Sequence, residues 1–142
     1  MDVGDLTIVV DGLDHPEGVA TGPDGTLYAG GELGQLYRVD PKDGSFEVVA
    51  ECGGFLLGIA VDGDGLVYAC NLKEQVVQRV DPHTGAVEIL SSGAPGRPLL
   101  TPNWCVFDPW GRLLVTDSGG WKHDNGCVLA RRGPTGRSPR PR

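Results

Sequence analysis

The sequence lacks any hydrophobic run long enough to cross a bilayer. A membrane-spanning helix needs about 18 or more consecutive apolar residues, and no such run occurs in the 142 residues. The first residues, MDVGDLTIVVDG, also lack the basic and apolar regions of a secretory signal peptide. We therefore expect a soluble, cytoplasmic protein with no membrane partner.

Cysteine pairs and the common catalytic motifs are also missing. The sequence contains neither GxSxG nor HExxH, so it has no local signature of a serine hydrolase or a zinc peptidase. The four cysteines are too far apart for a CxxC metal pair or for the dense disulfide framework of a small secreted domain. We expect buried, reduced thiols at Cys52, Cys70, Cys105 and Cys127.

Basic residues are in the minority, with 12 Lys and Arg against 19 Asp and Glu, which gives a net charge of −7 at pH 7. Five of the 12 lie in RRGPTGRSPRPR, residues 131–142, which contains no acid. The body before this segment is therefore strongly acidic, so it repels nucleic acid and suits a cation. We predict a disordered basic tail at 137–142, because Pro and Arg offer no apolar face for packing.

Three segments of the chain repeat one pattern, beginning at Glu17, Leu57 and Asn103. Each has a short apolar run, a tight turn that ends in glycine, and a second apolar run. The first two segments continue through a third run that ends in Asp-Pro-x-x-Gly, followed by a fourth run. Each unit therefore reads as a four-stranded antiparallel meander.

Meanders that repeat every 40 to 50 residues or so are typical of a β-propeller. A β-sandwich is the main alternative, but a sandwich does not require repeated turn positions. We predict an all-β fold, a partial β-propeller over 1–136, with blades at about 13–51, 55–92 and 100–136. A leading strand at 6–10 is predicted to close the last blade of a ring onto the first.

The predicted ring is incomplete. Propellers have about four to eight blades, and this sequence has about three. Where the third unit should supply a fourth strand, the sequence reads RSPRPR, which cannot donate regularly to a strand ladder. We expect either a truncated or frame-shifted version of a longer protein, or self-association of several copies through unpaired blade edges.

The repeats also resemble a known family. HPEGVATGPDGTLYAGG, the VDPxxG turns and TPNWCVFDPWGRLLVTDSG are similar to the amino-terminal half of the SMP-30/gluconolactonase/luciferin-regenerating-enzyme family of six-bladed propellers. CGGFLLGIAVDGDGLVYACN is as similar to a strictosidine-synthase-like relative. The first resemblance implies a metal-dependent hydrolase of a lactone or related ester, and we expect the truncated chain to be inactive alone.

The resemblance also implies a metal site. In that family a divalent metal, usually calcium (Ca2+), is held at the mouth of the central channel by a Glu and by Asn or Asp residues at equivalent blade positions. Glu17 matches the Glu of the family site. Asn103 matches the Asn of the third blade, and the resemblance implies that Asn103 also contacts the substrate. Leu57, at the same position of the second blade, cannot bind a metal. From the residues alone, a turn residue is the alternative reading of both Glu17 and Asn103.

Two further residues are candidates for roles in catalysis and substrate binding. Asp117, at the end of an apolar run in VTDSGGW, is a candidate catalytic proton carrier, although an acid at a strand end is usually a solvated turn residue. Arg97 lies where the resemblance implies a substrate-orienting group, with an ordinary surface arginine as the alternative. A different class of function stays open as well, because a non-catalytic NHL-like binding module needs none of these side chains.

Overall fold

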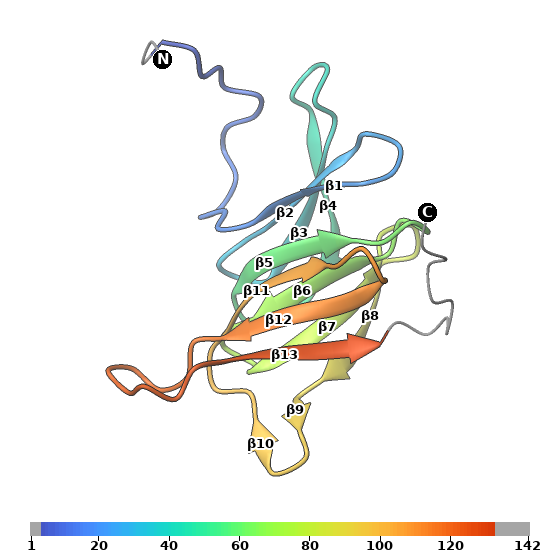
Figure 1. The fold of residues 1–142 in the computed structure, drawn as a ribbon. Helices are drawn as coiled ribbons and strands as arrows, with labels where there is room; N and C mark the ends of the chain where they lie inside the picture. Colours follow the sequence, from blue (N-terminus) through green and yellow to red (C-terminus); the bar gives the residue numbers. More distant parts are fainter. Residues whose placement is uncertain (1–3, 133–142) are drawn as a thin grey trace.

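The structure is a computed structural model that describes residues 4–132. Every regular element in that range is a β-strand, and the strands form three consecutive meanders and one small hairpin (Figure 1). Within the described range no helix has the length and apolar character needed to cross a membrane. The predicted all-β, partial β-propeller fold is confirmed.

The first two meanders are complete four-stranded antiparallel sheets, paired in sequence order. Blade 1 consists of β1 (Val19–Thr21), β2 (Leu27–Gly30), β3 (Gln35–Val39) and β4 (Phe46–Glu51). Blade 2 consists of β5 (Leu56–Val61), β6 (Val67–Asn71), β7 (Val76–Asp81) and β8 (Ala86–Ser91).

The third meander, blade 3, has three described strands, β11 (Pro102–Phe107), β12 (Arg112–Asp117) and β13 (Cys127–Arg132). A hairpin of β9 (Gly93–Ala94) and β10 (Arg97–Pro98), which the sequence did not predict, connects it to blade 2. The predicted tail at 137–142 and the last residues of the predicted third blade lie outside the described residues.

The turns between the first and second strands form as the Asp-Gly pattern predicts. Gly25, Gly65 and Gly111 have φ values of 87°, 83° and 76°, in the left-handed region that favours glycine. In blade 2, Asp62 begins the turn and accepts backbone N–H bonds from Asp64 and Leu66, and Asp108 does the same in blade 3. In blade 1, Asp24 lies within the turn and accepts the N–H of Thr26. Local sequence therefore sets the strand register in each blade.

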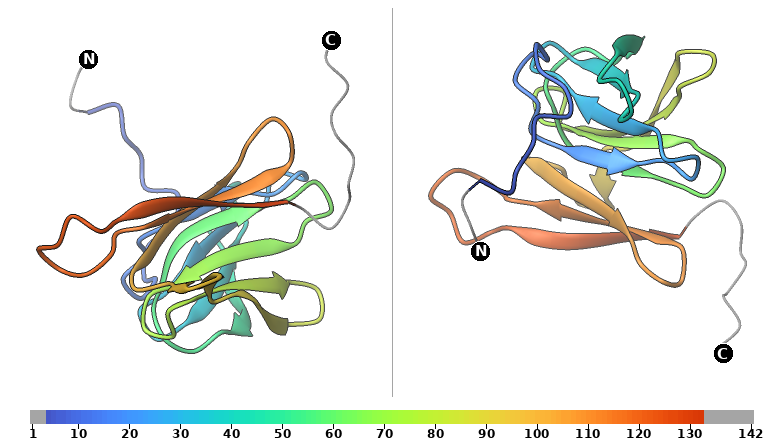
Figure 2. Two further views of the ribbon diagram at one scale, coloured as in Figure 1. Left: turned by 60° about the horizontal axis from the view of Figure 1, so that its bottom comes forward. Right: turned by 90° about the horizontal axis from the view of Figure 1, so that it is seen from above.

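The core lies between the blades, which stack face to face (Figure 2). One buried cluster, with Leu36, Leu56 and Val67 at its centre, joins blades 1 and 2. A second, with Val77 and Leu113, joins blades 2 and 3. Blade 2 is therefore covered on both sides, whereas the outward faces of blades 1 and 3 leave Val19 and Val106 exposed.

The structure differs from the prediction of a strand at 6–10. These residues form no ladder, and the segment runs away from the sheets in Figure 1. The side chains of Leu6 and Ile8 are 95% and 82% exposed. The apolar pattern suits a strand, but a strand needs a neighbour to pair with, and no described strand lies beside this segment.

Candidate functional site

The first strands of the three blades lie side by side, and their close contacts show which residues of the three blades lie next to one another. A Cβ atom added to Gly18 would clash with the backbone oxygen of Leu57. A Cβ atom added to Gly58 would lie 2.5 Å from the Cα atom of Trp104 and 2.8 Å from the backbone oxygen of Asn103. Each position is therefore a glycine because a side chain there would clash with the backbone of the neighbouring inner strand.

These contacts place Glu17, Leu57 and Asn103 at equivalent positions, with Leu57 in β5, Asn103 in β11 and Glu17 two residues before β1. The alignment of the repeats is therefore reproduced in space. Leu57 offers no ligand atom, so the pair of oxygen-bearing side chains, Glu17 and Asn103, lies on either side of it.

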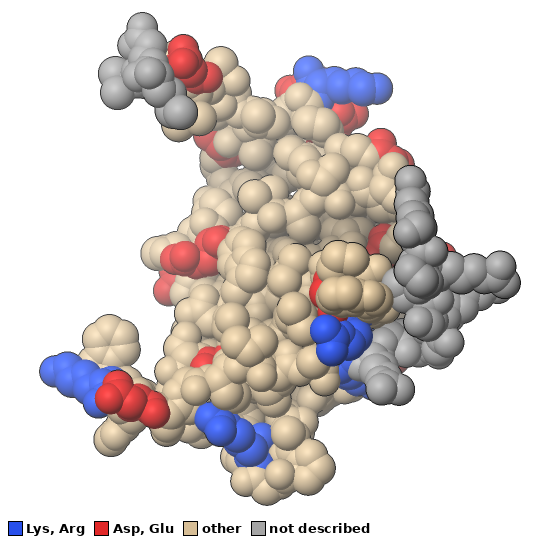
Figure 3. Space-filling model, in the orientation of Figure 1, with Lys and Arg blue, Asp and Glu red and all other residues tan. Residues whose placement is uncertain are grey.

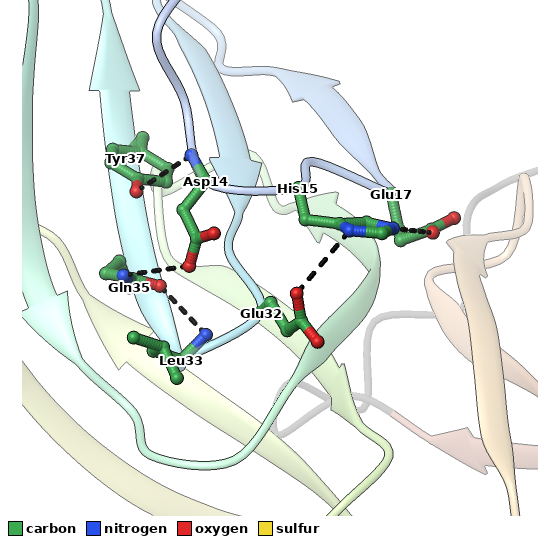
Figure 4. A network of polar contacts seen from close by, with 7 residues as sticks. All are labelled: Asp14, His15, Glu17, Glu32, Leu33, Gln35 and Tyr37. Atoms are coloured by element: carbon green, nitrogen blue, oxygen red, sulfur yellow. Dashed lines mark hydrogen bonds and ion pairs between the residues drawn. The ribbon is translucent and has the colours of Figure 1, made fainter.

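Glu17 contacts a histidine that also reaches a second glutamate (Figure 4). Its Oε1 lies 3.1 Å from His15 Nε2, and His15 Nδ1 lies 3.5 Å from Glu32 Oε2. The His15 ring packs edge-on against Phe55, with ring centroids 5.6 Å apart. All three polar side chains are about half exposed, so the cluster is open to a ligand from solvent.

The loop that carries Glu17 is tied to the turn between β2 and β3. The backbone N–H of Asp14 donates to the Tyr37 hydroxyl at 3.2 Å, and Gln35 Nε2 donates to the Asp14 carboxylate at 3.2 Å. The backbone N–H of Glu32 donates in turn to the Asp14 carbonyl at 3.3 Å. These bonds hold Glu17 and Glu32 on the same side of blade 1 (Figure 4).

Asn103 is the second residue of β11, beside a break in register between Pro102 and Trp104. Its side chain is exposed, and Nδ2 donates to Ser118 Oγ at 3.2 Å. This contact uses the NH2 group, so it does not consume the amide oxygen, which is the atom that ligates a cation.

Asp117 is buried, with 5% of its surface exposed, and it is saturated by backbone donors. Its carboxylate accepts the N–H groups of Leu100 at 2.9 Å, Thr101 at 2.8 Å and Gly119 at 2.9 Å. Burial opposes ionisation, but these N–H groups outweigh it and hold the pKa of Asp117 below its usual value. The contacts fix the segment that enters β11, so Asp117 positions Asn103; its catalytic role stays a prediction.

Arg97, in β10, donates from its guanidinium to the backbone oxygen of Asn125. It also lines a groove of about 500 Å3 between blade 2 and β13, whose lining includes neither Glu17 nor Asn103. Its predicted contact with substrate stays a prediction.

The donor chemistry fits part of a calcium shell. Calcium prefers six to eight oxygen ligands from carboxylates, amides and water. Glu17 supplies one carboxylate and Asn103 one amide oxygen. Within residues 4–132 no group of three or more His, Cys, Asp and Glu is placed to hold a metal ion. The described chain therefore contributes two side-chain ligands at most at this level.

Sequence reasoning missed Glu32 and Phe55, the residues that hold His15. Neither could be found from local spacing, because Glu32 follows β2 and Phe55 precedes β5, and only the folded blades bring them to His15. Sequence reasoning also missed the structural role of Asp117. Leu100 and Thr101 lie just before β11, and only the pairing of β11 with β12 brings them to Asp117.

Comparisons with known proteins support the same architecture. A family sequence profile described as strictosidine synthase-like, N-terminal, matches residues 5–39. A comparison with curated proteins finds no match. The similarities to solved structures cover more of the chain than this profile does. They show that the chain has the propeller fold that gluconolactonase and regucalcin share.

Three solved structures show this likeness. A gluconolactonase from Xanthomonas campestris has a TM-score of 0.73 at 20% identity, over 87% of this chain and 46% of its own. The calcium-binding protein regucalcin from Agrobacterium tumefaciens has a TM-score of 0.57 at 25% identity, over 77% and 40%. A PQQ-bound aldose sugar dehydrogenase from Streptomyces coelicolor has a TM-score of 0.69 at 24% identity, over 94% and 52%.

The chain thus spans about half the length of the propellers it resembles. The resemblance predicted from the blade motifs is confirmed at the level of the fold, and the profile match at residues 5–39 agrees with the strictosidine-synthase-like alternative for this part of the chain.

Proposed function

We propose that this chain supplies three blades of a calcium-dependent propeller hydrolase that opens a lactone or a related ester. The observation that carries the proposal is the equivalence of Glu17 and Asn103, which lie at matching positions where the inner strands of blades 1 and 3 begin. Support also comes from two structures of the same fold, one described as a gluconolactonase and the other as a calcium-binding protein.

In this proposal Glu17 and Asn103 hold the cation. When bound, the metal supplies a Lewis acid that polarises the ester carbonyl and lowers the pKa of a water molecule. His15 orients Glu17 by hydrogen bonding to Oε1, and the second carboxylate oxygen, Oε2, takes no part in that contact. Glu32 holds the opposite ring nitrogen of His15, which fixes the ring.

The remaining residues prepare the surroundings of the cation. Asp117 holds Leu100 and Thr101, and so fixes the start of β11 that carries Asn103. The charge of the chain also bears on its ligand. Nineteen acidic residues against 12 basic ones favour a cation and disfavour nucleic acid. In Figure 3 the acidic side chains are scattered over the face shown. We propose a small-molecule substrate and a cytoplasmic location.

Calcium titration of matched glutamate variants tests this proposal. Glu17→Gln keeps the shape of the side chain but removes its charge, so calcium affinity should fall by at least about tenfold, or roughly 1.4 kcal/mol. Glu47→Gln is the control, because Glu47 is also exposed but pairs with Arg38 on the outer strands of blade 1. Calorimetry should show calcium affinity unchanged in this control.

The activity is measured in the same proteins by acid release from a simple lactone in a pH-stat. Hydrolysis that depends on calcium and is lost in Glu17→Gln supports an enzyme. Equal calcium affinity in the Glu17→Gln and Glu47→Gln variants contradicts the ligand assignment. If the wild-type chain neither binds calcium nor hydrolyses the lactone, the result favours a non-catalytic propeller module.

A further inference from the structure

In the part of the chain that the structure describes, blade 3 has an open edge. Blades 1 and 2 each end in a fourth, outer strand, β4 and β8, whereas the described part of blade 3 ends at β13. No described residue pairs with the free edge of β13. An exposed strand edge presents unpaired N–H and C=O groups that can pair with another strand.

A groove lies alongside this edge, between blade 2 and blade 3. It measures about 500 Å3 and is lined largely by apolar side chains. Blade 2 contributes Val77 and Leu90, and blade 3 contributes Leu113, Cys127 and Leu129. The groove is therefore an apolar surface next to unpaired backbone, which suits an extended segment with alternating apolar residues.

The chain contains such a segment, and no strand within residues 4–132 pairs with it. Residues 5–10, DLTIVV, which we call the arm, match the six-residue length of β4 and β8. The side chains of Leu6 and Ile8 are 95% and 82% exposed. When the arm pairs as a strand, Val10 falls on the same side as these two, because strand side chains alternate. Burying these three side chains would remove a large apolar surface from water.

The arm leaves the fold at blade 1, the blade farthest from the open edge. A Cβ atom added to Gly44, in the turn between β3 and β4, would lie 2.5 Å from the backbone oxygen of Val9. Blade 2 separates this point from β13 of the same chain, as Figures 1 and 2 both show. The arm is thus placed to reach a blade beside blade 1, not its own blade 3.

We infer that the arm of one copy of this chain pairs with β13 of a second copy, and that the exchange is mutual. Antiparallel pairing with Val10 opposite the partner's Cys127 places Ile8 opposite the partner's Leu129. In this register Leu6, Ile8 and Val10 all face the groove, because Leu129 packs against the core between blades 2 and 3, whereas Val128 is 68% exposed. The arm then takes the position that β4 and β8 hold in the complete blades.

A second copy is the occupant that fits the rest of the molecule. The chain spans 46% and 47% of two propellers of its fold, so two copies match one ring in length. Blades 1 and 3 also leave apolar side chains exposed on their outward faces, Val19 at 60% and Val106 at 49%. A two-fold ring covers both faces through two identical junctions.

The ring also completes the candidate site. Two-fold symmetry brings the partner's Glu17 and the partner's Asn103 to the same channel mouth, so four oxygen-bearing side chains replace two. Four such ligands with water approach the six to eight oxygens that calcium takes. This last step depends on the proposed function, whereas the pairing of the arm does not.

Disulfide trapping without calcium tests the pairing and its register. Val10→Cys should form a covalent dimer with the partner's Cys127 when oxidised glutathione is added, seen on a non-reducing gel. Val9→Cys is the matched control, because its side chain lies on the opposite face of the arm, and it should give little dimer. Adding Cys127→Ser to the Val10→Cys protein should abolish the covalent dimer.

The mass in solution tests the assembly itself. Light scattering should give twice the chain mass of 15.0 kDa for the wild-type protein. Thr7→Pro removes a backbone donor from the arm, which forms no ladder in the single chain, and should shift the mass to that of one chain while the circular dichroism spectrum is kept. The substitution Leu33→Asp, at a side chain 72% exposed outside the arm, should leave the dimer intact.

A wild-type monomer, a larger open assembly, or equal trapping by Val9→Cys and Val10→Cys would overturn the inference. Calcium is then added to the trapped dimer and to the Thr7→Pro monomer, and its effect on Tm is compared. Stabilisation of the dimer alone supports the shared site. A trapped dimer that calcium does not stabilise overturns the shared site and the proposed function, and leaves the pairing of the arm established.

Discussion

The buried carboxylate of Asp117 gives the sharpest energetic prediction. It accepts three backbone N–H groups, from Leu100, Thr101 and Gly119, in a position only 5% exposed. Asp117→Asn keeps the size of the side chain but replaces one accepting oxygen with an NH2 group. At least one N–H group then loses its acceptor, which costs about 1–3 kcal/mol, and the others lose a charged acceptor.

We therefore expect Asp117→Asn to lower the free energy of unfolding by about 2–4 kcal/mol. Urea denaturation at pH 7 measures this change as a shift of the midpoint. Asp124→Asn is the control, because Asp124 is an exposed residue in the neighbouring loop and its substitution removes the same charge. An unchanged midpoint for Asp117→Asn would refute the structural role assigned here.

The same residue predicts a pH dependence. The pKa of Asp117 is lower in the folded protein than in the unfolded chain, where it is about 3.9, so ionised Asp117 stabilises the fold above that value. This contribution is lost as the pH falls through the folded pKa. The wild-type protein should therefore lose more stability between neutral and acidic pH than Asp117→Asn, and parallel pH profiles of the two would contradict the assignment.

Two further predictions concern packing between the blades. Gly58→Ala should destabilise the protein by about 1–3 kcal/mol, because the new methyl group meets the backbone of Trp104 and Asn103, whereas Gly63→Ala has no atom within 4 Å and should change the urea midpoint little. Burial raises the pKa of Cys52 to about 12, and a hydrogen bond with the Cys105 thiol, followed by burial, raises the pKa of Cys70. Iodoacetamide at mildly alkaline pH should therefore modify half-buried Cys127 first, as read by peptide mass spectrometry.

The blades were predictable from sequence because their determinants are local. Alternating apolar residues and glycine turns recur in each repeat, and neighbouring strands pair in sequence order. The same repeats place Glu17, Leu57 and Asn103 at one level, which Gly18 and Gly58 confirm in space.

Features that depend on distant contacts could not be predicted in the same way. The apolar pattern at 6–10 indicates a strand, but the partner needed for its ladder is not within the described chain. The contact of His15 with Glu32 depends on how the loop before β1 folds onto the turn after β2. The sequence indicates Asp117 as a candidate proton carrier at the end of an apolar run, and only the fold shows three backbone donors around it.

The central claim is that Glu17 and Asn103 hold one cation from equivalent inner-strand positions. Asn103→Leu tests it directly, because it places at blade 3 the residue type that Leu57 already provides at blade 2. Calorimetric titration should show calcium affinity reduced by about tenfold, as in Glu17→Gln. Calcium affinity that is lost in Glu17→Gln but unchanged in Asn103→Leu would contradict the claim.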